Sequence, residues 1–322
     1  MIKFLVSLSG MRYIWKEYIL KPLHSMKKTV ILALCLMLYA GFTFGQPVKE
    51  TYQYALKGAD TLRLDRLYDP AKMAEGKTPA MVYMFGGGFA YGSRGGRFNY
   101  LTDIGVQVFS IDYRLGLKEY GYSPAPPEIR EKATDMALDD LTDAMAYVLA
   151  HAEEWGVDPA KIMVSGSSAG GLTTLRAIYD ICNDGPFSVK FPSGWMPAGY
   201  IGYAGGLSLK EKELTWPKKP CPMLFFHGTA DTSVPYEIRP GEYFTYFGPL
   251  YITRQLHEMG VPFWLYSEIG ADHVMSYKPF SGYNTHEIQT FVQKFVVEGL
   301  QLEMKTEELN HAGPSRLPGA NR

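Results

Sequence analysis

The stretch Lys-Ile-Met-Val-Ser at 161–165 runs directly into Gly166-Ser167-Ser168-Ala169-Gly170-Gly171, and a helical pattern then continues to Cys182. A short apolar run bounded by glycines is typical of a buried strand, so this motif occupies a strand-to-helix turn. The middle residue of Gly-x-Ser-x-Gly at such a turn has a strained backbone, and only small neighbours fit around it. The pattern therefore predicts that Ser168 is a nucleophile. A flexible glycine- and serine-rich turn is the alternative.

Similar apolar runs recur on both sides of this motif and alternate with helical patterns. Strands are expected at Glu50–Leu56, Thr61–Tyr68, Ala80–Phe85, Val106–Ile111, Lys161–Ser165, Gly199–Tyr203, Met223–His227 and Phe263–Glu268. Helices are expected over Ala133–Trp155, Gly170–Cys182 and about His286–Leu300. This alternation indicates an α/β fold, in which a mainly parallel central sheet has helices on both faces. Ligands of such sheets bind at the carboxyl ends of the strands.

A nucleophilic serine needs a base to accept its proton and an acid to orient that base. Asp231 follows one expected strand and His273 follows another, so both lie just beyond a carboxyl end. The chain order is serine, aspartate, histidine, and all three side chains are expected at the same edge of the sheet. We therefore predict a catalytic triad of Ser168, His273 and Asp231.

Two neighbouring residues are alternatives for the acid and the base. Asp272 is adjacent to His273, and a residue in that position does not easily fold back onto the imidazole. His227 immediately precedes the loop of Asp231 and is better interpreted as a buried structural histidine. Both alternatives are less favoured than the triad.

The tetrahedral intermediate of an acyl transfer also needs backbone N–H donors. Gly86-Gly87-Gly88 follows the first expected core strand, where a backbone without side chains can approach a substrate. The expected donors are the N–H groups of Gly87 and Gly88, together with that of Ala169 at a helix N-terminus. A merely tight turn is the alternative for the three glycines.

Taken together, these residues resemble the esterase and lipase branch of the α/β-hydrolase superfamily. The likeness is closest to hormone-sensitive-lipase-like enzymes and to bacterial acetylxylan or feruloyl esterase-like groups. The matching pieces are Gly86–Gly88, Asp112-Tyr113-Arg114-Leu115, Gly166–Gly171, the segment from His227 through Asp231 to Pro235, and His273. The resemblance covers about residues 60–300 and implies the α/β-hydrolase fold.

The sequence departs from that pattern at two positions. Phe85 stands where the family usually has a histidine before the three glycines, so the loop lacks an imidazole that would brace it. Ser167 stands where an aspartate is common among the lipase-like relatives, which favours the carbohydrate-esterase side.

The expected function is hydrolysis of short-acyl carboxylic esters, with acetyl or feruloyl esters of plant carbohydrate as candidate substrates. A prolyl-oligopeptidase-type peptidase has the same triad order, but the sequence shows no propeller domain. A catalytically silent binding module on the same fold would not need nucleophile, acid, base and donors together. A long-chain lipase would need a more hydrophobic lid than this chain offers. No cofactor is expected.

An aromatic-rich segment, 236–247, leaves the loop that carries Asp231. Tyr236, Tyr243 and Phe247 in this segment, and Phe89 beside the three glycines, are candidate substrate-binding residues because aromatic faces suit sugar rings or a hydroxycinnamoyl group. An aromatic loop packed onto the domain is the alternative. No large cap insertion is evident, so an open site for short acyl groups is expected.

The N-terminal region is best excluded from the fold. Met26-Lys27-Lys28 precedes the apolar run Thr29–Phe44, a pattern typical of a signal peptide, and translation could start at Met26. We expect residues 1–45 to be removed and the protein to be exported; a retained membrane anchor is the alternative. The catalytic domain is expected over residues 46–303, followed by a frayed polar tail over 304–322.

Composition excludes several other classes of protein. The 322 residues have a formal net charge of −1 and no stripe of Lys and Arg, so nucleic acid is not an expected partner. No His, Cys, Asp or Glu spacing indicates a metal site. Cys182 and Cys221 remain after removal of the leader, either as a disulfide or as two buried free thiols.

Overall fold

The computed structural model describes residues 47–309 except 74–75, 122 and 278–281. The expected leader, residues 1–45, lies outside the described residues, and so does the segment 310–322. Among the described residues, no helix combines the length and the apolar character that crossing a membrane requires.

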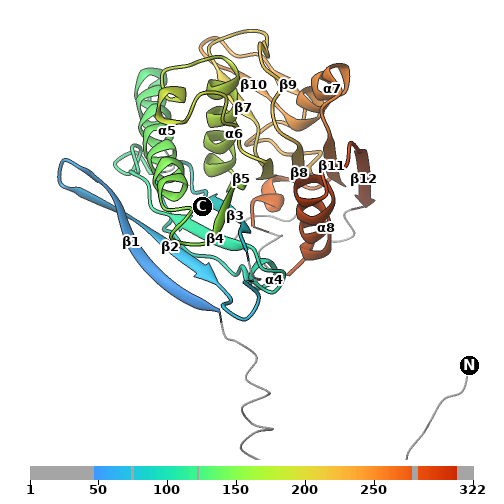
Figure 1. Ribbon diagram of the computed structural model, residues 1–322. Helices are drawn as coiled ribbons and strands as arrows, with labels where there is room; N and C mark the ends of the chain where they lie inside the picture. The colour runs from blue at the N-terminus through green and yellow to red at the C-terminus, as the bar shows by residue number, and fades with distance from the viewer. Residues whose placement is uncertain (1–46, 74–75, 122, 278–281, 310–322) are drawn as a thin grey trace, which may run out of the picture. The chain divides into compact units, whose positions relative to one another are not determined.

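Nine strands form the central sheet, in the order β1-β2-β4-β3-β5-β6-β8-β11-β12 (Figure 1). Their bounds are β1 Val48–Lys57, β2 Asp60–Tyr68, β3 Thr78–Met84, β4 Gln107–Ile111, β5 Val157–Ser167, β6 Gly199–Tyr203, β8 Met223–Gly228, β11 Phe263–Ile269 and β12 Glu303–Leu309. The pairs β1–β2 and β2–β4 are antiparallel, and every other neighbouring pair is parallel. The predicted α/β fold with a mainly parallel sheet is confirmed.

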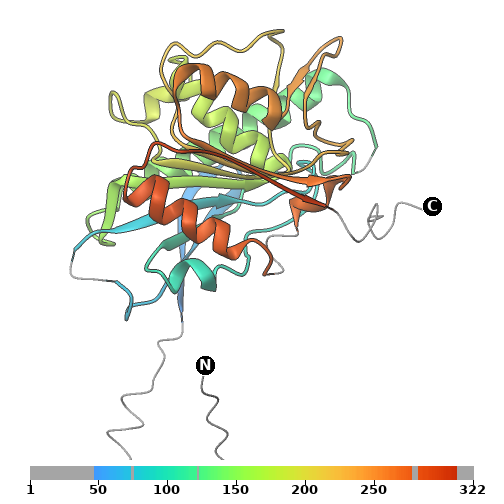
Figure 2. The ribbon, with the colours of Figure 1, turned by 90° about the vertical axis from the view of Figure 1, so that its right-hand side faces the viewer.

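Helices cover both faces of this sheet (Figure 2). The longer ones, α5 Pro127–Ala150, α6 Ala169–Cys182 and α7 Pro249–Met259, lie on one face. The opposite face carries α4 Asn99–Thr102 and α8 Thr285–Phe291, and α8 continues as a π-helical turn over Val292–Val297. Helix α5 begins six residues before the expected Ala133, because Pro127 and Glu128 are well suited to a first turn whose N–H groups have no helical partner.

The inner strands are buried on both faces. Every residue of β4, β6 and β8 is buried, as is the run from Ala80 to Met84 in β3. This is why those strands were visible in the sequence as continuous apolar runs rather than as alternating patterns. The layers of apolar side chains fix β5, β8 and β11 rigidly, and these strands carry the site described below.

The sequence did not reveal a second, smaller sheet. It consists of β7 Leu207–Leu209, β10 Thr245–Phe247 and β9 Ile238–Arg239, paired antiparallel in the order β7-β10-β9. Strands of two or three residues are too short to show a period of two. The expected aromatic segment 236–247 therefore contains two short strands instead of a single loop.

The prediction of a frayed polar tail from residue 304 onward was wrong for its first residues. Residues Glu303–Leu309 form β12, which pairs parallel with the whole of β11, from Phe263 opposite Glu303 to Ile269 opposite Leu309. Backbone hydrogen bonds do not depend on side-chain polarity, so an exposed edge strand can be rich in charged residues. The domain therefore extends past residue 303 to at least Leu309.

Cys182 and Cys221 are free thiols, and both are buried. Burial raises the pKa of the Cys182 thiol to about 12, and it also raises the pKa of Cys221 well above its usual value. Of the two states that the sequence left open, the structure has the free thiols.

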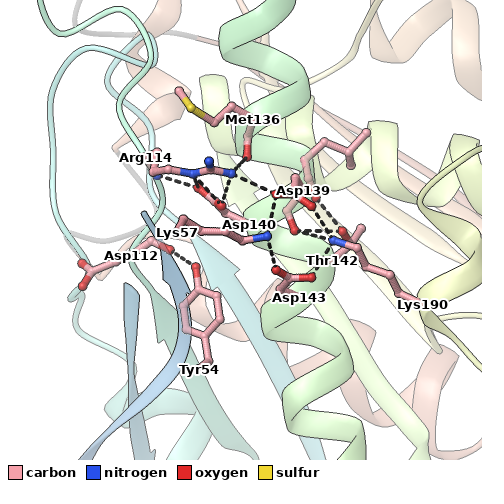
Figure 3. Close-up of polar contacts among 11 residues, drawn as sticks. Tyr54, Lys57, Asp112, Arg114, Met136, Asp139, Asp140, Thr142, Asp143 and Lys190 are labelled. Atoms are coloured by element: carbon pink, nitrogen blue, oxygen red, sulfur yellow. Dashed lines mark hydrogen bonds and ion pairs between the residues drawn. The ribbon is translucent and has the colours of Figure 1, made fainter. Parts of the chain in front are cut away.

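An ion pair fastens the loop after β4 to helix α5 (Figure 3). Asp140 on α5 is fully buried, and its carboxylate accepts hydrogen bonds from the backbone N–H of Arg114 (2.7 Å) and from its guanidinium (2.9 Å from Nε). Arg114 also reaches Asp139 at 2.9 Å. Burial raises the pKa of Asp140, although Arg114 opposes that effect.

A second group of charges continues the same network along α5 (Figure 3). Lys57 of β1 lies 2.7 Å from Asp139 and 2.6 Å from Asp143, and Lys190 lies at the same two distances from these carboxylates. Burial alone would raise the pKa of Asp139, but hydrogen bonds from Lys190 and Lys57 lower it to about 2. Two carboxylates thus bind two ammonium groups and tie β1 to α5.

We expect Asp140→Ala to lower the free energy of unfolding by about 3 kcal/mol, because it leaves Arg114 without its buried partner. Urea denaturation measures this loss. The matched control is Lys218→Ala, which removes the exposed pair between Lys218 and Asp184 and should cost less than about 1 kcal/mol. Equal losses in the two variants would contradict a structural role for the buried pair.

Candidate active site

Ser168 lies at the turn between β5 and α6 with φ 49° and ψ −118°. A non-glycine residue in this region costs about 1–3 kcal/mol and persists only when its surroundings hold it. Here the Ser168 N–H donates to the carbonyl of Tyr203 on β6 (2.8 Å), and the Ser168 carbonyl accepts from Leu172 on α6 (2.8 Å). The strained turn projects the Ser168 hydroxyl away from the sheet.

Two glycines make room for this turn. A Cβ at Gly170 would lie 2.2 Å from the carbonyl oxygen of Met84 at the end of β3. A Cβ at Gly86 would lie 2.9 Å from the Ser167 carbonyl oxygen and 3.1 Å from the Ser168 Cβ. The nucleophile turn and the triple-glycine loop therefore pack backbone against backbone, which explains the glycines at both places.

The structure brings the three predicted residues into hydrogen-bonding sequence. The Ser168 Oγ lies 2.8 Å from His273 Nε2, and His273 Nδ1 lies 2.7 Å from Asp231 Oδ2. They follow the carboxyl ends of β5, β11 and β8 respectively. The side chain of Asp231 is fully buried and that of His273 nearly so. This arrangement lets the imidazole accept the serine proton while the carboxylate fixes its orientation.

Further hydrogen bonds hold the Asp231 carboxylate in place. Its Oδ1 accepts the backbone N–H groups of Ser233 and Val234, both at 2.9 Å. Burial alone would raise the pKa of Asp231, but hydrogen bonds from His227 and His273 keep it well below its usual range. The carboxylate therefore stays ionised and acceptor-only at neutral pH.

The two alternatives from the sequence occupy other positions. Asp272 accepts a weak hydrogen bond from the backbone of Thr232 (3.4 Å), whereas the His273 ring bonds to Asp231 and Ser168. His227 is buried in β8; its Nε2 donates to the Val234 carbonyl (2.9 Å) and lies 3.4 Å from Asp231. His227 thus contacts the acid rather than the nucleophile, a contact that the sequence interpretation missed.

The triple-glycine loop lies beside the nucleophile. Gly88 and Ala169 line the same cavity as Ser168, and Gly87 precedes them with φ 102°. The Gly87 carbonyl accepts the N–H groups of Ala90 and Tyr91, which closes the loop into a tight turn. Among the described residues, neither Gly88 nor Ala169 donates its N–H to another backbone group outside the regular elements. Both N–H groups are therefore available to an oxyanion.

Tyr113 braces this loop in place of the histidine that the family pattern would supply. Its hydroxyl donates to the Gly86 carbonyl (3.1 Å), and its ring lies 4.4 Å from the ring of Phe85. Tyr113 directly precedes Arg114, so the buried ion pair with α5 also positions this brace. The resemblance included Asp112-Tyr113-Arg114-Leu115, but it did not imply this role for Tyr113.

Ser167, which stands where relatives often have an aspartate, connects two parts of the site. Its hydroxyl donates to the carbonyl of Ser276, at the end of the short 3₁₀ helix His273–Ser276. The residue before the nucleophile is therefore tied to the turn that carries the base.

Part of the chain is similar to a known protein family and to proteins of other organisms. The family model described as BD-FAE matches residues 64–183, which include the triple-glycine loop and Ser168 but neither Asp231 nor His273. The human protein arylacetamide deacetylase-like 2 is 29% identical over 157 residues, which are 46% of this chain and 35% of that protein. A fumonisin B1 esterase from Sphingopyxis macrogoltabida is 30% identical over 132 residues, which are 38% of this chain and 24% of that enzyme.

Among solved structures, a thermophilic esterase from Thermogutta terrifontis superposes with a TM-score of 0.56 at 22% identity, covering 79% of this chain and 93% of that one. This chain has the α/β-hydrolase fold. The matched part spans about a quarter to a third of the curated relatives' length, so their activities do not transfer directly.

A cavity opens at Ser168 and has a volume of about 400 Å³. Its walls come from the triple-glycine loop, from the first turns of α5, from α6 and from the small sheet. Of the predicted substrate-binding residues, Phe89 lines the cavity. Phe244 and Tyr246 line it as well, and the sequence analysis had not selected either of them.

The other three predicted substrate-binding residues do not line the cavity. Phe247 is fully buried in β10, where alternate side chains point to opposite faces and Tyr246 takes the cavity side. The Tyr236 hydroxyl bonds to Ser267 of β11 (2.6 Å), away from the nucleophile. Tyr243 does not line the cavity, although its hydroxyl donates to Glu131 (3.0 Å), which does. The prediction that Tyr236, Tyr243 and Phe247 line the cavity was therefore wrong.

Among the described residues, no group of three or more His, Cys, Asp or Glu side chains is arranged to hold a metal ion.

We expect Tyr113→Phe to lower kcat of the hydrolase on p-nitrophenyl acetate about 10-fold with little change in KM, since the loss of one brace loosens the oxyanion donors. Steady-state kinetics measures both constants. Tyr236→Phe is the matched control, because it also removes one partly buried tyrosine hydroxyl but leaves the loop intact. A similar kcat for Tyr113→Phe and the wild type would refute the bracing role.

Proposed function

We propose that the protein is a serine carboxylesterase that hydrolyses short-acyl esters through an acyl-enzyme. The observation that carries this proposal is the pair of hydrogen bonds from Ser168 through His273 to Asp231, at 2.8 and 2.7 Å, at the mouth of a cavity with free N–H donors. The esterases among the relatives and structural neighbours support the same class of reaction.

In the first step, His273 Nε2 accepts the hydroxyl proton as the Ser168 Oγ attacks the ester carbonyl carbon. The N–H groups of Gly88 and Ala169, with that of Gly87, stabilise the oxyanion. The buried carboxylate of Asp231 stabilises the imidazolium and fixes its tautomer. His273 then donates its proton to the leaving alcohol, and the C–O bond to the alcohol breaks.

In the second step, water replaces the alcohol. His273 accepts a proton from the water, whose oxygen attacks the acyl carbon, and the oxyanion occupies the same N–H donors. Collapse of this intermediate breaks the bond to the Ser168 Oγ, which recovers its proton from His273. The acid product leaves and the original protonation state returns.

Acetyl or feruloyl esters of plant carbohydrate are the proposed substrates. Phe89, Phe244 and Tyr246 supply aromatic faces to the cavity, and such faces stack on sugar rings and on hydroxycinnamoyl groups. A cavity of about 400 Å³ holds a short acyl chain or a single aromatic acyl group.

We also propose that the protein is exported. This proposal rests on the basic and apolar pattern at residues 26–44, and fractionation of a producing cell tests it.

We expect Ser168→Ala to lower kcat on p-nitrophenyl acetate by at least about 10⁴-fold, because the residual rate comes only from the oxyanion donors and binding. A fluorophosphonate probe should label the wild type and leave this variant unlabelled. Cys182→Ser is a control that leaves the site intact. Retained hydrolysis in Ser168→Ala would sink the proposal.

A panel of p-nitrophenyl acetate, butyrate and octanoate, with acetylated xylan and methyl ferulate, tests the substrate range. We expect kcat/KM to fall from acetate to octanoate, because the cavity is closed by α5 and by the small sheet. A preference for octanoate would contradict the short-acyl assignment without affecting the esterase assignment. Phe244→Ala and Tyr246→Ala should weaken feruloyl hydrolysis more than acetyl hydrolysis.

A further inference from the structure

Six charged side chains line the cavity beyond the nucleophile. They come from α5, from α6 and from the segment after β7, and they are Arg130, Glu131, Asp135, Arg176, Lys210 and Glu211. The two signs are equal in number. The charge that a substrate meets therefore depends on which of these groups are already paired within the protein.

Three of the six have partners. Glu131 lies 2.6 Å from Lys210 and also accepts the Tyr243 hydroxyl at 3.0 Å. Arg130 donates from Nη2 to the Tyr246 hydroxyl, and its guanidinium lies 5.8 Å from the centre of the Phe244 ring. These contacts hold α5 against the small sheet. Lys210 and Glu131 neutralise each other, whereas Arg130 keeps its positive charge because its partners are uncharged.

Asp135 and Glu211 are exposed, so water can solvate both carboxylates at the rim. Arg176 is different, because it is half-buried within the cavity wall. Its Nε is buried and has no hydrogen-bond partner among the described residues, and no carboxylate among them lies within ion-pair distance. Arg114, by contrast, has its guanidinium bound by two carboxylates.

A buried polar group without a hydrogen-bond partner is uncommon in proteins. The free-energy cost is highest when the unpaired donor is charged. A guanidinium is planar, and its N–H groups match the two oxygens of a carboxylate. Arg176 therefore has the chemistry of a carboxylate-binding group. Within the described residues no carboxylate forms an ion pair with Arg176, although its charge acts to lower the pKa of three nearby carboxylates, those of Glu131, Asp135 and Asp180.

The position of Arg176 fits a ligand that also reaches the nucleophile. Ser168, Leu172 and Arg176 follow one another along α6, and all three line the cavity. Eight residues of α-helix span about 12 Å, and helical side chains lean toward the helix N-terminus. The guanidinium thus lies less than that length from the reacting centre, within reach of the far end of a small ester.

We propose that Arg176 determines specificity by binding a carboxylate on the substrate, so that the preferred substrates are esters that also carry a free acid group. Esters of uronic acids and half-esters of dicarboxylic acids belong to this chemical class. The inference rests on the proposed esterase function and adds the charge of the substrate to it.

The test compares pairs of esters that differ only in charge. On the alcohol side the pair is 4-acetoxyphenylacetate and its methyl ester; on the acyl side it is the 4-methylumbelliferyl half-ester of suberic acid and the corresponding methyl ester. We expect a higher kcat/KM for the free acid in at least one pair. The pair that shows the preference identifies which side of the ester faces Arg176.

Arg176→Gln should lower the ratio of kcat/KM for acid over methyl ester about 10- to 100-fold, the range typical of a hydrogen bond to a charged group. Arg176→Lys keeps the charge and should restore part of the ratio. The control is Arg254→Gln on α7, which removes an exposed arginine paired with Glu237 and should leave the ratio unchanged. An unchanged ratio in Arg176→Gln overturns the proposal.

A binding measurement separates this inference from the proposed function. 4-Hydroxyphenylacetate should raise the Tm of the wild type more than 4-hydroxyphenylacetamide does, and the difference should vanish in Arg176→Gln. This result supports the carboxylate site even for a protein that hydrolyses no ester in the panel. Equal Tm shifts for acid and amide in the wild type overturn it, even for a protein that cleaves neutral esters rapidly.

Discussion

The site depends on the strained backbone of Ser168. A serine at φ 49° is held only because the surrounding chain approaches to backbone contact, with Gly170 against the end of β3 and Gly86 against Ser168 itself. The same contact places the triple-glycine loop next to the nucleophile, so the N–H donors and the hydroxyl are positioned by one packing arrangement. The strain is offset by the buried strands β3, β5 and β6 on either side of the turn.

The order of strands and helices and the residues of the triad could be predicted from the sequence, because both follow from where the buried strands end. Continuous apolar runs identified β5, β8 and β11, and the polar residues that follow them had to meet at one edge of a parallel sheet. The small sheet and β12 were not accessible. Strands of two or three residues have no visible period, and β12 is an edge strand whose sequence is mostly charged.

The cavity was harder to predict for a different reason. Arg130 and Arg176 lie on two helices whose other faces carry ordinary apolar patterns, and only the packing of α5 beside α6 brings these side chains to one wall. In the aromatic segment, the choice between Tyr246 and Phe247 depended on the register of the three-residue strand β10, where a shift of one residue exchanges the buried face and the face toward the cavity. Tyr113 could have been suspected from the missing histidine at position 85, which left a bracing role to be filled.

Strand β12 also protects the outer flank of the sheet. It covers β11 along its full length, so the unpaired N–H and C=O groups of the sheet belong to a strand bearing Glu303, Lys305, Glu307 and Glu308. A chain shortened to the boundary suggested by its composition, at residue 303, would uncover the apolar strand that leads to His273. Charged residues on an edge strand oppose the strand-to-strand pairing by which uncovered sheets assemble into fibrils. The residues of β12 therefore contribute to solubility as well as to the fold.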